Sequence, residues 1–178
     1  MEYAKSKDMF VIADVSNQIF ETLDISIHDL SFFKELGLAG IRLDYGFNAM
    51  EEAIMTQNKL GLKIELNMSM GPAHLETIMN YDPNLDNLRG SHNFYPHRYT
   101  GLDQKHFNHC STGFKAYSLH TSAFVNSKNA RFGPWPVEEG LCTLEQHREL
   151  PIDVQAKDLF STNWIDEVII ANEFASED

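Results

Sequence analysis

Short apolar runs recur along the chain, and each of them ends in a polar or charged residue. The first five runs are followed by stretches that resemble helices in their spacing of apolar residues. This alternation is typical of repeated βα units, which predicts a parallel sheet or a barrel. The six runs, which are the expected strands, are Phe10–Val15, Gly40–Asp44, Lys63–Asn67, Leu88–Asn93, Thr121–Asn126 and Glu167–Asn172.

Capping residues indicate where the helices begin. Ser26 is expected to cap a helix that ends at Gly37, and Asn48 is expected to cap the next helix. Thr143 and Gln146 fit a capping box, which predicts a helix start after the longest loop. Further helices are expected over residues 72–79, 104–117 and 151–160.

The side chains of the expected strands differ between the two faces. Arg42 and Asp44 share one face of their strand, as do Glu65 and Asn67 of the next, while the opposite faces are apolar. A doubly wound sheet is apolar on both faces, so this pattern favours the interior of a TIM-type (β/α) barrel. Such a barrel usually needs about 200–250 residues. We therefore expect one incomplete barrel domain over residues 1–178, with about six βα units.

The charge and composition of the chain disfavour several classes of binding partner. The formal net charge is −12 and the basic residues are scattered, which disfavours binding to nucleic acid or to an anionic membrane. No apolar run approaches the roughly 20 residues of a spanning helix, and the N-terminus does not resemble a signal peptide. The two cysteines, Cys110 and Cys142, are far apart in the sequence. A reduced cytoplasmic protein is therefore expected.

Two carboxyl groups are the first candidates for chemistry. Asp44 and Glu65 end consecutive expected strands, which lie about 4.8 Å apart in a sheet. Glycoside hydrolysis uses two carboxyl groups, separated by about 5–5.5 Å in retaining enzymes and about 6.5–9.5 Å in inverting ones. The alternative is a salt bridge inside the barrel between Arg42 and either carboxylate.

Two later segments add candidates for sugar binding. His92, Asn93 and Tyr95 follow the fourth expected strand and offer hydrogen bonds and a flat apolar surface to a sugar. A core histidine with satisfied ring nitrogens is the alternative for His92. Trp135 lies on a proline-rich loop that is expected to form a pocket wall, and Glu145 begins the next helix. The alternative for this segment is a solvated surface loop.

No cofactor or metal is expected. His106 and His109 lie on one side of an expected helix, but no acidic partner stands at the spacing of zinc proteases. The chain also lacks the glycine-rich motifs of nucleotide-binding proteins and the Gly-x-Ser-x-Gly motif of serine hydrolases.

Six segments in one order resemble a known family. They are Arg42-Leu-Asp-Tyr-Gly-Phe, Ile64-Glu-Leu-Asn-Met-Ser, His92-Asn-Phe-Tyr-Pro, Tyr99-Thr-Gly-Leu, Gly133-Pro-Trp-Pro and Gly140-Leu-Cys-Thr-Leu-Glu-Gln-His-Arg. Together they resemble the MupG-type 6-phospho-N-acetylmuramidases, which were long catalogued as bacterial outer surface proteins of unknown function. The resemblance covers essentially the whole chain.

The resemblance implies a TIM-barrel domain followed by a cyclophilin-like domain. It also implies hydrolysis of the bond between 6-phospho-N-acetylmuramic acid and N-acetylglucosamine, during cytoplasmic recycling of cell-wall sugars. By this resemblance, the strands are expected to correspond to strands three to eight of the family's barrel, and the C-terminal domain of the family is expected to be absent. Cys142 stands where a proline is expected. An incomplete sheet leaves open edges, which invite self-association.

The leading hypothesis is therefore a glycosidase-type barrel that acts on a phosphorylated amino-sugar disaccharide. Asp44 and Glu65 are the expected catalytic pair, with Glu145 as the substitute, and the phosphate is expected near Arg131 and Arg148. A non-catalytic remnant that binds sugar phosphates is the alternative. An isomerase or aldolase ranks lower, because Lys63 begins its strand instead of ending it. The other expected substrate-binding residues are Asp14, Arg42, Asn67, His92, Asn93, Tyr95 and Trp135.

Overall fold

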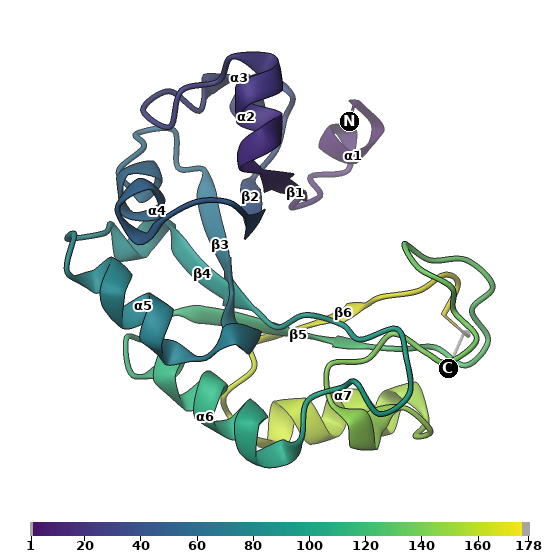
Figure 1. The fold of residues 1–178 in the computed structure, drawn as a ribbon. Coiled ribbons are helices and arrows are strands. Elements are labelled where there is room, and N and C mark those ends of the chain that lie inside the picture. The colour runs from purple at the N-terminus through teal and green to yellow at the C-terminus, as the bar shows by residue number, and fades with distance from the viewer. Residues whose placement is uncertain (1, 176–178) are drawn as a thin grey trace. The chain divides into compact units, whose positions relative to one another are not determined.

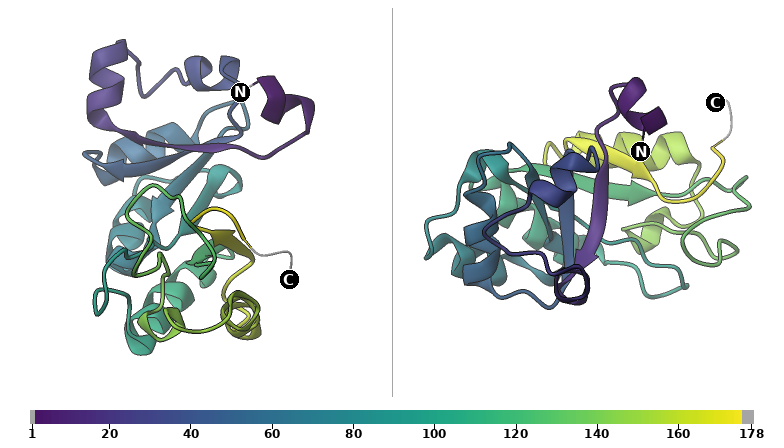
Figure 2. Two further views of the ribbon diagram at one scale, coloured as in Figure 1. Left: turned by 90° about the vertical axis from the view of Figure 1, so that its right-hand side faces the viewer. Right: turned by 90° about the horizontal axis from the view of Figure 1, so that it is seen from above.

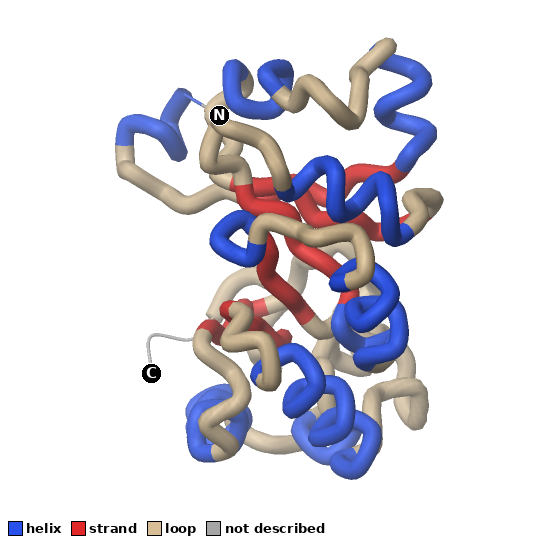
Figure 3. The backbone as a smooth tube through the Cα atoms, turned by 90° about the vertical axis from the view of Figure 1, so that its left-hand side faces the viewer, coloured by secondary structure: helices blue, strands red, loops and turns tan. Residues whose placement is uncertain are grey.

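The computed structural model describes residues 2–175, without the side chains of Glu2, Lys5, Asp44 and Tyr45. Over this range the strands form one six-stranded sheet in which they follow one another in chain order (Figure 1). The pairs β1–β2, β2–β3 and β5–β6 are parallel. The predicted α/β class with a six-stranded parallel arrangement is thus confirmed, and the alternation of helix and strand can be followed in Figure 3.

Each predicted apolar run overlaps one of the observed strands. The bounds of β3 agree with the prediction, whereas β4 ends two residues before the predicted Asn93. The backbone N–H of Asn93 donates to Ser69 Oγ at 2.9 Å, so the chain leaves the strand there. The strands are β1 (Ile12–Ser16), β2 (Gly40–Tyr45), β3 (Lys63–Asn67), β4 (Leu88–Ser91), β5 (His120–Val125) and β6 (Glu167–Ile170).

The chain divides into two compact units, and each is described by itself. The first unit holds residues 1–67 and 73–89, and the second holds residues 68–72 and 90–178. The division passes through β4, so the first unit contains β1 to β3 and the second contains β5 and β6. The expected single domain over residues 1–178 stays a prediction.

In the first unit, apolar side chains from the strands pack against those of the helices. Ile41 of β2, Ile64 of β3 and Met55 of α4 are almost completely buried. Asn48 caps α4 as predicted, because its side chain accepts from the N–H groups of Met50 and Glu51. The helices are α1 (Glu2–Ser6), α2 (Asn17–Leu23), α3 (Ser31–Glu35), α4 (Ala49–Thr56), α5 (Pro72–Met79), whose first residue belongs to the second unit, and the short η2 (Leu85–Asn87).

The predicted helix from Ser26 to Gly37 is wrong at its start. Residues 26–29 form a turn in which Asp29 N–H donates to the carbonyl of Ser26. The side chain of Asp29 accepts from Ser31 N–H at 3.0 Å, and α3 begins only there. The sequence pattern also missed α2, whose Phe20 packs 5.3 Å from the ring of Phe33.

In the second unit, α6 (Gln104–Lys115) and α7 (Ile152–Ser161) pack against β5 and β6 (Figure 1). Their shared core contains Phe107, Val125 and Leu159. The loop between β5 and the short helix η3 (Glu145–His147) extends past the carboxyl end of β5 (Figure 2). A further short helix, η1 (Met68–Met70), belongs to this unit.

The predicted capping box at Thr143 is wrong. The Thr143 hydroxyl donates to the carbonyl of Asn93 at 2.8 Å and accepts from Phe124 N–H at 2.9 Å. Thr143 therefore ties two loops together, and η3 begins at Glu145 without a capping side chain.

Among residues 2–175, no helix combines the length and the apolar character that a membrane crossing requires.

We expect Gly90→Ala to destabilise the second unit by about 1–3 kcal/mol through overpacking. A Cβ atom at Gly90 would lie 2.5 Å and 2.7 Å from two ring carbons of the buried Phe114. Urea unfolding measures the loss, and adding Phe114→Leu should restore part of it. A Gly90→Ala protein as stable as the parent would contradict this packing.

We expect Glu52→Gln to raise the melting temperature at pH 7.5. Burial raises the pKa of Glu52, although its carboxylate lies 2.5 Å from His74 Nε2. The folded pKa therefore exceeds the unfolded value, so the contribution of Glu52 to stability is greatest below pH 4.5 and declines as pH rises through the folded pKa. Thermal melts from pH 4 to 8 should show a flatter profile for Glu52→Gln. The exposed Glu76→Gln on α5 is the control, and equal profiles for both variants would refute the assignment.

Candidate functional site

Four charged side chains form a row across β1 to β4 in the first unit. Asp14, Arg42 and Glu65 stand in register on β1, β2 and β3, and Arg89 lies on β4. Because the register aligns these positions, the charges alternate in sign from strand to strand. We call Asp14, Arg42, Glu65 and Arg89 the charge row.

Ion pairs connect every neighbour in the charge row. Arg42 Nη1 lies 3.2 Å from Glu65 Oε1, and Arg42 Nε lies 3.4 Å from Asp14 Oδ1. Arg89 Nε lies 2.8 Å from Glu65 Oε2. The side chains of Arg42, Glu65 and Arg89 are 8%, 4% and 8% exposed, whereas that of Asp14 is 72% exposed. The row therefore runs from the buried interior of the unit to its surface.

Burial makes these ion pairs interdependent. Removing a buried charge from water costs several kcal/mol, which is recovered only when its partners remain in place. The ring of Phe10 covers the guanidinium of Arg89 at 5.5 Å and further limits its contact with water. Both carboxylate oxygens of Glu65 engage an arginine, so this group is poorly placed to give a proton to a leaving group.

Two polar residues follow the charge row along the chain, at the ends of their strands. Asp44 follows Arg42, and Asn67 follows Glu65, at the carboxyl ends of β2 and β3. Leu43 pairs with Leu66, immediately before Asp44 and Asn67. The register between β1 and β2 shifts at Asp44, since Val15 pairs with Leu43 and Ser16 pairs with Tyr45. Asn67 is half-buried, and the side chain of Asp44 lies outside the described part of the structure.

His92 lies in the second unit as a fully buried ring. Its Nδ1 is 3.0 Å from Ser69 Oγ, and its Nε2 is 3.0 Å from Ser111 Oγ. The ring stacks on Phe107 with centroids 4.7 Å apart. This geometry matches the core histidine that the sequence left open as an alternative. Through Ser69, whose hydroxyl also accepts from Asn93 N–H, His92 fixes where the chain leaves β4.

Glu145 and Arg148 form an ion pair that holds two loops, and we call the pair the clasp. Arg148 Nε donates to Glu145 Oε1 at 2.8 Å, and Arg148 Nη2 donates to Oε2 at 2.7 Å. The same carboxylate accepts from the N–H groups of Tyr99 and Gly101, both at 2.8 Å. The remaining Arg148 nitrogen, Nη1, donates to the carbonyl of Tyr95 at 3.0 Å and to those of residues 139 and 140.

The clasp changes how both residues are interpreted. The hydrogen bonds from Arg148 lower the pKa of Glu145 to about 2, with smaller contributions from Tyr99 and Gly101. A carboxyl group that stays ionised at every physiological pH cannot act as a general acid. Arg148 is 4% exposed, and all three of its nitrogens are engaged, which argues against the predicted contact with phosphate.

The other predicted residues of the second unit lie on its loops. Asn93 and Tyr95 are half-buried, and Tyr95 N–H donates to the carbonyl of Cys142 at 3.0 Å. Trp135 and Arg131 are exposed on the loop after β5. The structure therefore brings Asp14, Arg42 and Glu65 together in one unit, and it gathers Tyr95, Glu145 and Arg148 in the other.

Sequence reasoning missed Arg89. The candidate residues in the run Leu88–Asn93 were chosen at the end of the strand, and Arg89 is its second residue. The signal was present, because a lone arginine between Leu88 and Gly90 in a buried strand needs a charged partner.

No metal centre emerges from the described side chains, because nowhere do three His, Cys, Asp or Glu residues gather closely enough to hold an ion. His106 Nε2 lies 2.9 Å from the carbonyl of Ser69 and 3.3 Å from Cys110 Sγ. Burial raises the pKa of Cys110 to about 11, so this thiol stays protonated.

Comparisons with known proteins identify relatives of the whole chain. A family model described as 6-phospho-N-acetylmuramidase, N-terminal, matches residues 1–178. No curated protein matches. The crystal structure of an uncharacterized B. cereus protein is 50% identical, with a TM-score of 0.87, over 99% of this chain and 49% of that one. A conserved Enterococcus faecalis protein of unknown function is 28% identical, with a TM-score of 0.83, over 98% and 48%. The chain spans about half the length of these solved proteins.

We expect Glu65→Gln to destabilise the protein by about 3–5 kcal/mol, because it removes the buried carboxylate that two guanidinium groups share. Asp14→Asn is the matched control on the exposed end of the row, and it should cost no more than about 1 kcal/mol. Denaturant unfolding measures both. A Glu65→Gln protein within 0.5 kcal/mol of the parent, an order-of-magnitude threshold for a surface change, would show that the row contributes little.

Proposed function

The chain belongs to the 6-phospho-N-acetylmuramidase N-terminal family, and on that premise we propose that it carries the sugar-cleaving chemistry of a glycoside hydrolase. The proposed substrate is the disaccharide of 6-phospho-N-acetylmuramic acid and N-acetylglucosamine. The match of the family model over residues 1–178 carries this proposal and confirms the resemblance seen in the six sequence segments. The parallel arrangement supports it, since such sheets gather chemistry at the carboxyl ends of their strands.

We propose that the six strands belong to a TIM-type barrel and correspond to strands three to eight of the family. The strand order agrees with this assignment, because consecutive strands of such a barrel are neighbours. The charge row supplies polar side chains on one face of β1 to β4, as a barrel interior does in its layers.

Asp44 is the proposed proton donor. Among the predicted carboxyl groups, Glu65 is engaged by two arginines and Glu145 is ionised at physiological pH. Asp44 stands at the carboxyl end of β2, beyond the charge row. A single carboxylic acid is sufficient when the substrate's own acetamido group acts as the nucleophile. In that reaction, the acetamido oxygen bonds to the anomeric carbon while Asp44 protonates the departing glycosidic oxygen.

The substrate-binding residues follow from their positions at strand ends and loops. Asn67 follows Leu66, whose partner Leu43 precedes Asp44, and Asn67 is proposed to orient the acetamido group. Asn93, Tyr95 and Trp135 are proposed to contact the sugar rings, and the exposed Arg131 is proposed to meet the phosphate. The proposed setting is the cytoplasmic recycling of cell-wall sugars.

We expect the protein to release N-acetylglucosamine from the phosphorylated disaccharide, and Asp44→Asn to lower turnover by at least about 100-fold, the typical contribution of general acid catalysis. Chromatographic detection of both products measures the rate. Asp24→Asn, at the exposed end of α2, is the control and should retain the parental rate.

The assay separates the glycosidase from the non-catalytic alternative. If the parent binds the disaccharide in a thermal-shift titration but releases no product, a sugar-phosphate-binding protein is the better description. If the turnover rate of Asp44→Asn equals that of the parent, Asp44 is not the proton donor. The same assay on the B. cereus relative, which extends beyond this chain, tests whether the additional length is needed.

A further inference from the structure

Tyr99 has an unusual combination of backbone strain and exposure. Its φ is +66°, in the left-handed region that favours glycine. Tyr99 is 90% exposed, so packing of its side chain does not offset the energy of the strained backbone. Such a conformation in a bulky residue costs of the order of an ordinary hydrogen bond and persists only where surrounding contacts impose it.

The clasp is what imposes this conformation. Glu145 accepts from Tyr99 N–H through one oxygen and from Gly101 N–H through the other, both at 2.8 Å. Between them, Thr100 closes a turn, with its hydroxyl donating to the carbonyl of His97 at 2.6 Å. Arg148 fixes the carboxylate from the buried side. A charged, largely buried pair is thus used to hold an exposed loop in one conformation.

The backbone arrangement does not require a tyrosine. The clasp binds the N–H group of residue 99, which any residue except proline supplies, and glycine would adopt the same φ without strain. The loop conformation therefore does not need the aromatic ring, and a tyrosine at this φ costs more conformational energy than a glycine would. Strain of this kind concentrates at functional sites.

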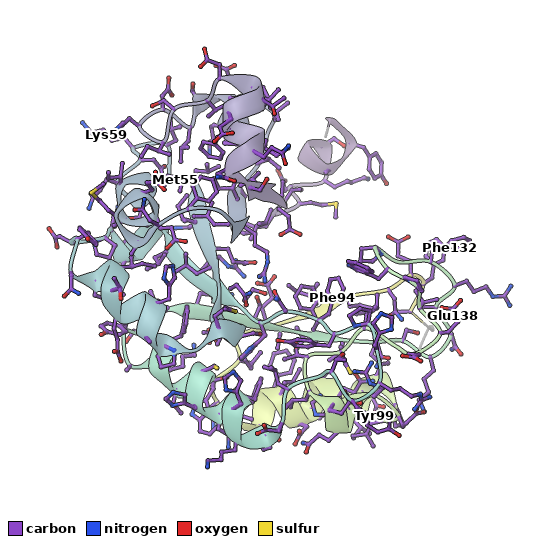
Figure 4. All side chains as sticks on the ribbon, viewed as in Figure 1. Met55, Lys59, Phe94, Tyr99, Phe132 and Glu138 are labelled. Carbon is purple, nitrogen blue, oxygen red and sulfur yellow. The ribbon has the colours of Figure 1, made fainter. Side chains whose placement is uncertain are left out.

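We propose that Tyr99 contacts the substrate by stacking its ring on a pyranose face of the amino sugar, and that Glu145 and Arg148 are its positioning residues. This inference rests on the proposed function. Tyr99 lies on the loop that follows β4, and Figure 4 labels it in the second unit. Ligands of parallel α/β sheets bind outside the carboxyl ends of strands, where this loop lies.

The chemistry fits a sugar ring. One face of a pyranose presents C–H groups, which match the negatively charged face of an aromatic ring, and its hydroxyls remain available to polar neighbours. Either the N-acetylglucosamine ring or the phosphorylated muramic ring offers this surface. Titrations with each sugar separately identify which ring Tyr99 contacts.

Tyr99→Gly separates a binding role from a structural one. The substitution removes the ring and the strain together, so the protein should be at least as stable as the parent in a thermal melt. Its dissociation constant for the sugar should nevertheless rise by about tenfold, the usual loss when a contact aromatic is truncated. Nuclear magnetic resonance titration with N-acetylglucosamine, and separately with 6-phospho-N-acetylmuramic acid, measures this without needing turnover. Tyr99→Phe should bind nearly as well as the parent.

Asn163→Gly is the matched control. Asn163 is exposed, also belongs to the second unit, and has a positive φ of 58°. Its replacement should relieve strain in the same way without changing affinity for either sugar. If Tyr99→Gly binds both sugars like the parent, or if the parent binds neither, the inference is wrong. Tyr99-dependent binding in a protein that releases no product would support the inference while overturning the proposed hydrolysis.

Glu145→Gln tests the positioning role. The amide keeps one acceptor oxygen but loses the charge that Arg148 and the loop amides require, so hydrogen exchange at Tyr99 and Gly101 should accelerate. With substrate, KM should rise by several-fold while kcat changes little, because the loop no longer presents the ring in one conformation. A collapse of kcat with an unchanged KM would instead assign Glu145 to the chemical step and overturn its role as a positioning residue.

Discussion

The ion pairs of the charge row constrain the first unit more than any other interaction. Three side chains that are less than one-tenth exposed carry full charges on adjacent strands, and each forms an ion pair with its neighbour. A shift of register by one residue would turn these side chains to the opposite face and leave buried charges without partners. Because these charges are buried, their pairing favours one alignment of β1 to β4.

The same row determines where chemistry is possible. Arg42 and Glu65 pair with each other before the strand ends, which favours placing the proposed substrate contacts at residues farther along the strands. Asp44 and Asn67 hold those positions at the carboxyl ends of β2 and β3. We therefore interpret the charge row as the group that aligns the strands, and we assign the proposed ligand contacts to the residues beyond it.

The sequence predicted every strand because the apolar runs are short and bounded by polar residues. The helix signals were less reliable. Asn48 caps α4 as expected, but Ser26 forms a turn, and Thr143 bonds to two other loops. The same residue types cap helices and form hydrogen bonds in turns and loops, so the sequence alone does not distinguish these roles. Likewise, Glu145, Arg148 and His92 have the residue types of an active site. Only coordinates reveal that their polar atoms are already occupied by loop amides, carbonyls and serine hydroxyls.

Buried charged side chains have different partners in the two units. The first aligns strands through a row of charges, whereas the second uses one ion pair to bind the backbone of its loops. A clasp of this kind is effective because Arg148 and Glu145 neutralise each other, so that the remaining oxygen and nitrogen sites can bind peptide groups without an uncompensated charge. These hydrogen bonds tie residues 95–101 to residues 139–148. A loop that is fixed in this way can keep a strained, exposed aromatic residue in place before any ligand arrives, which lowers the entropy cost of binding.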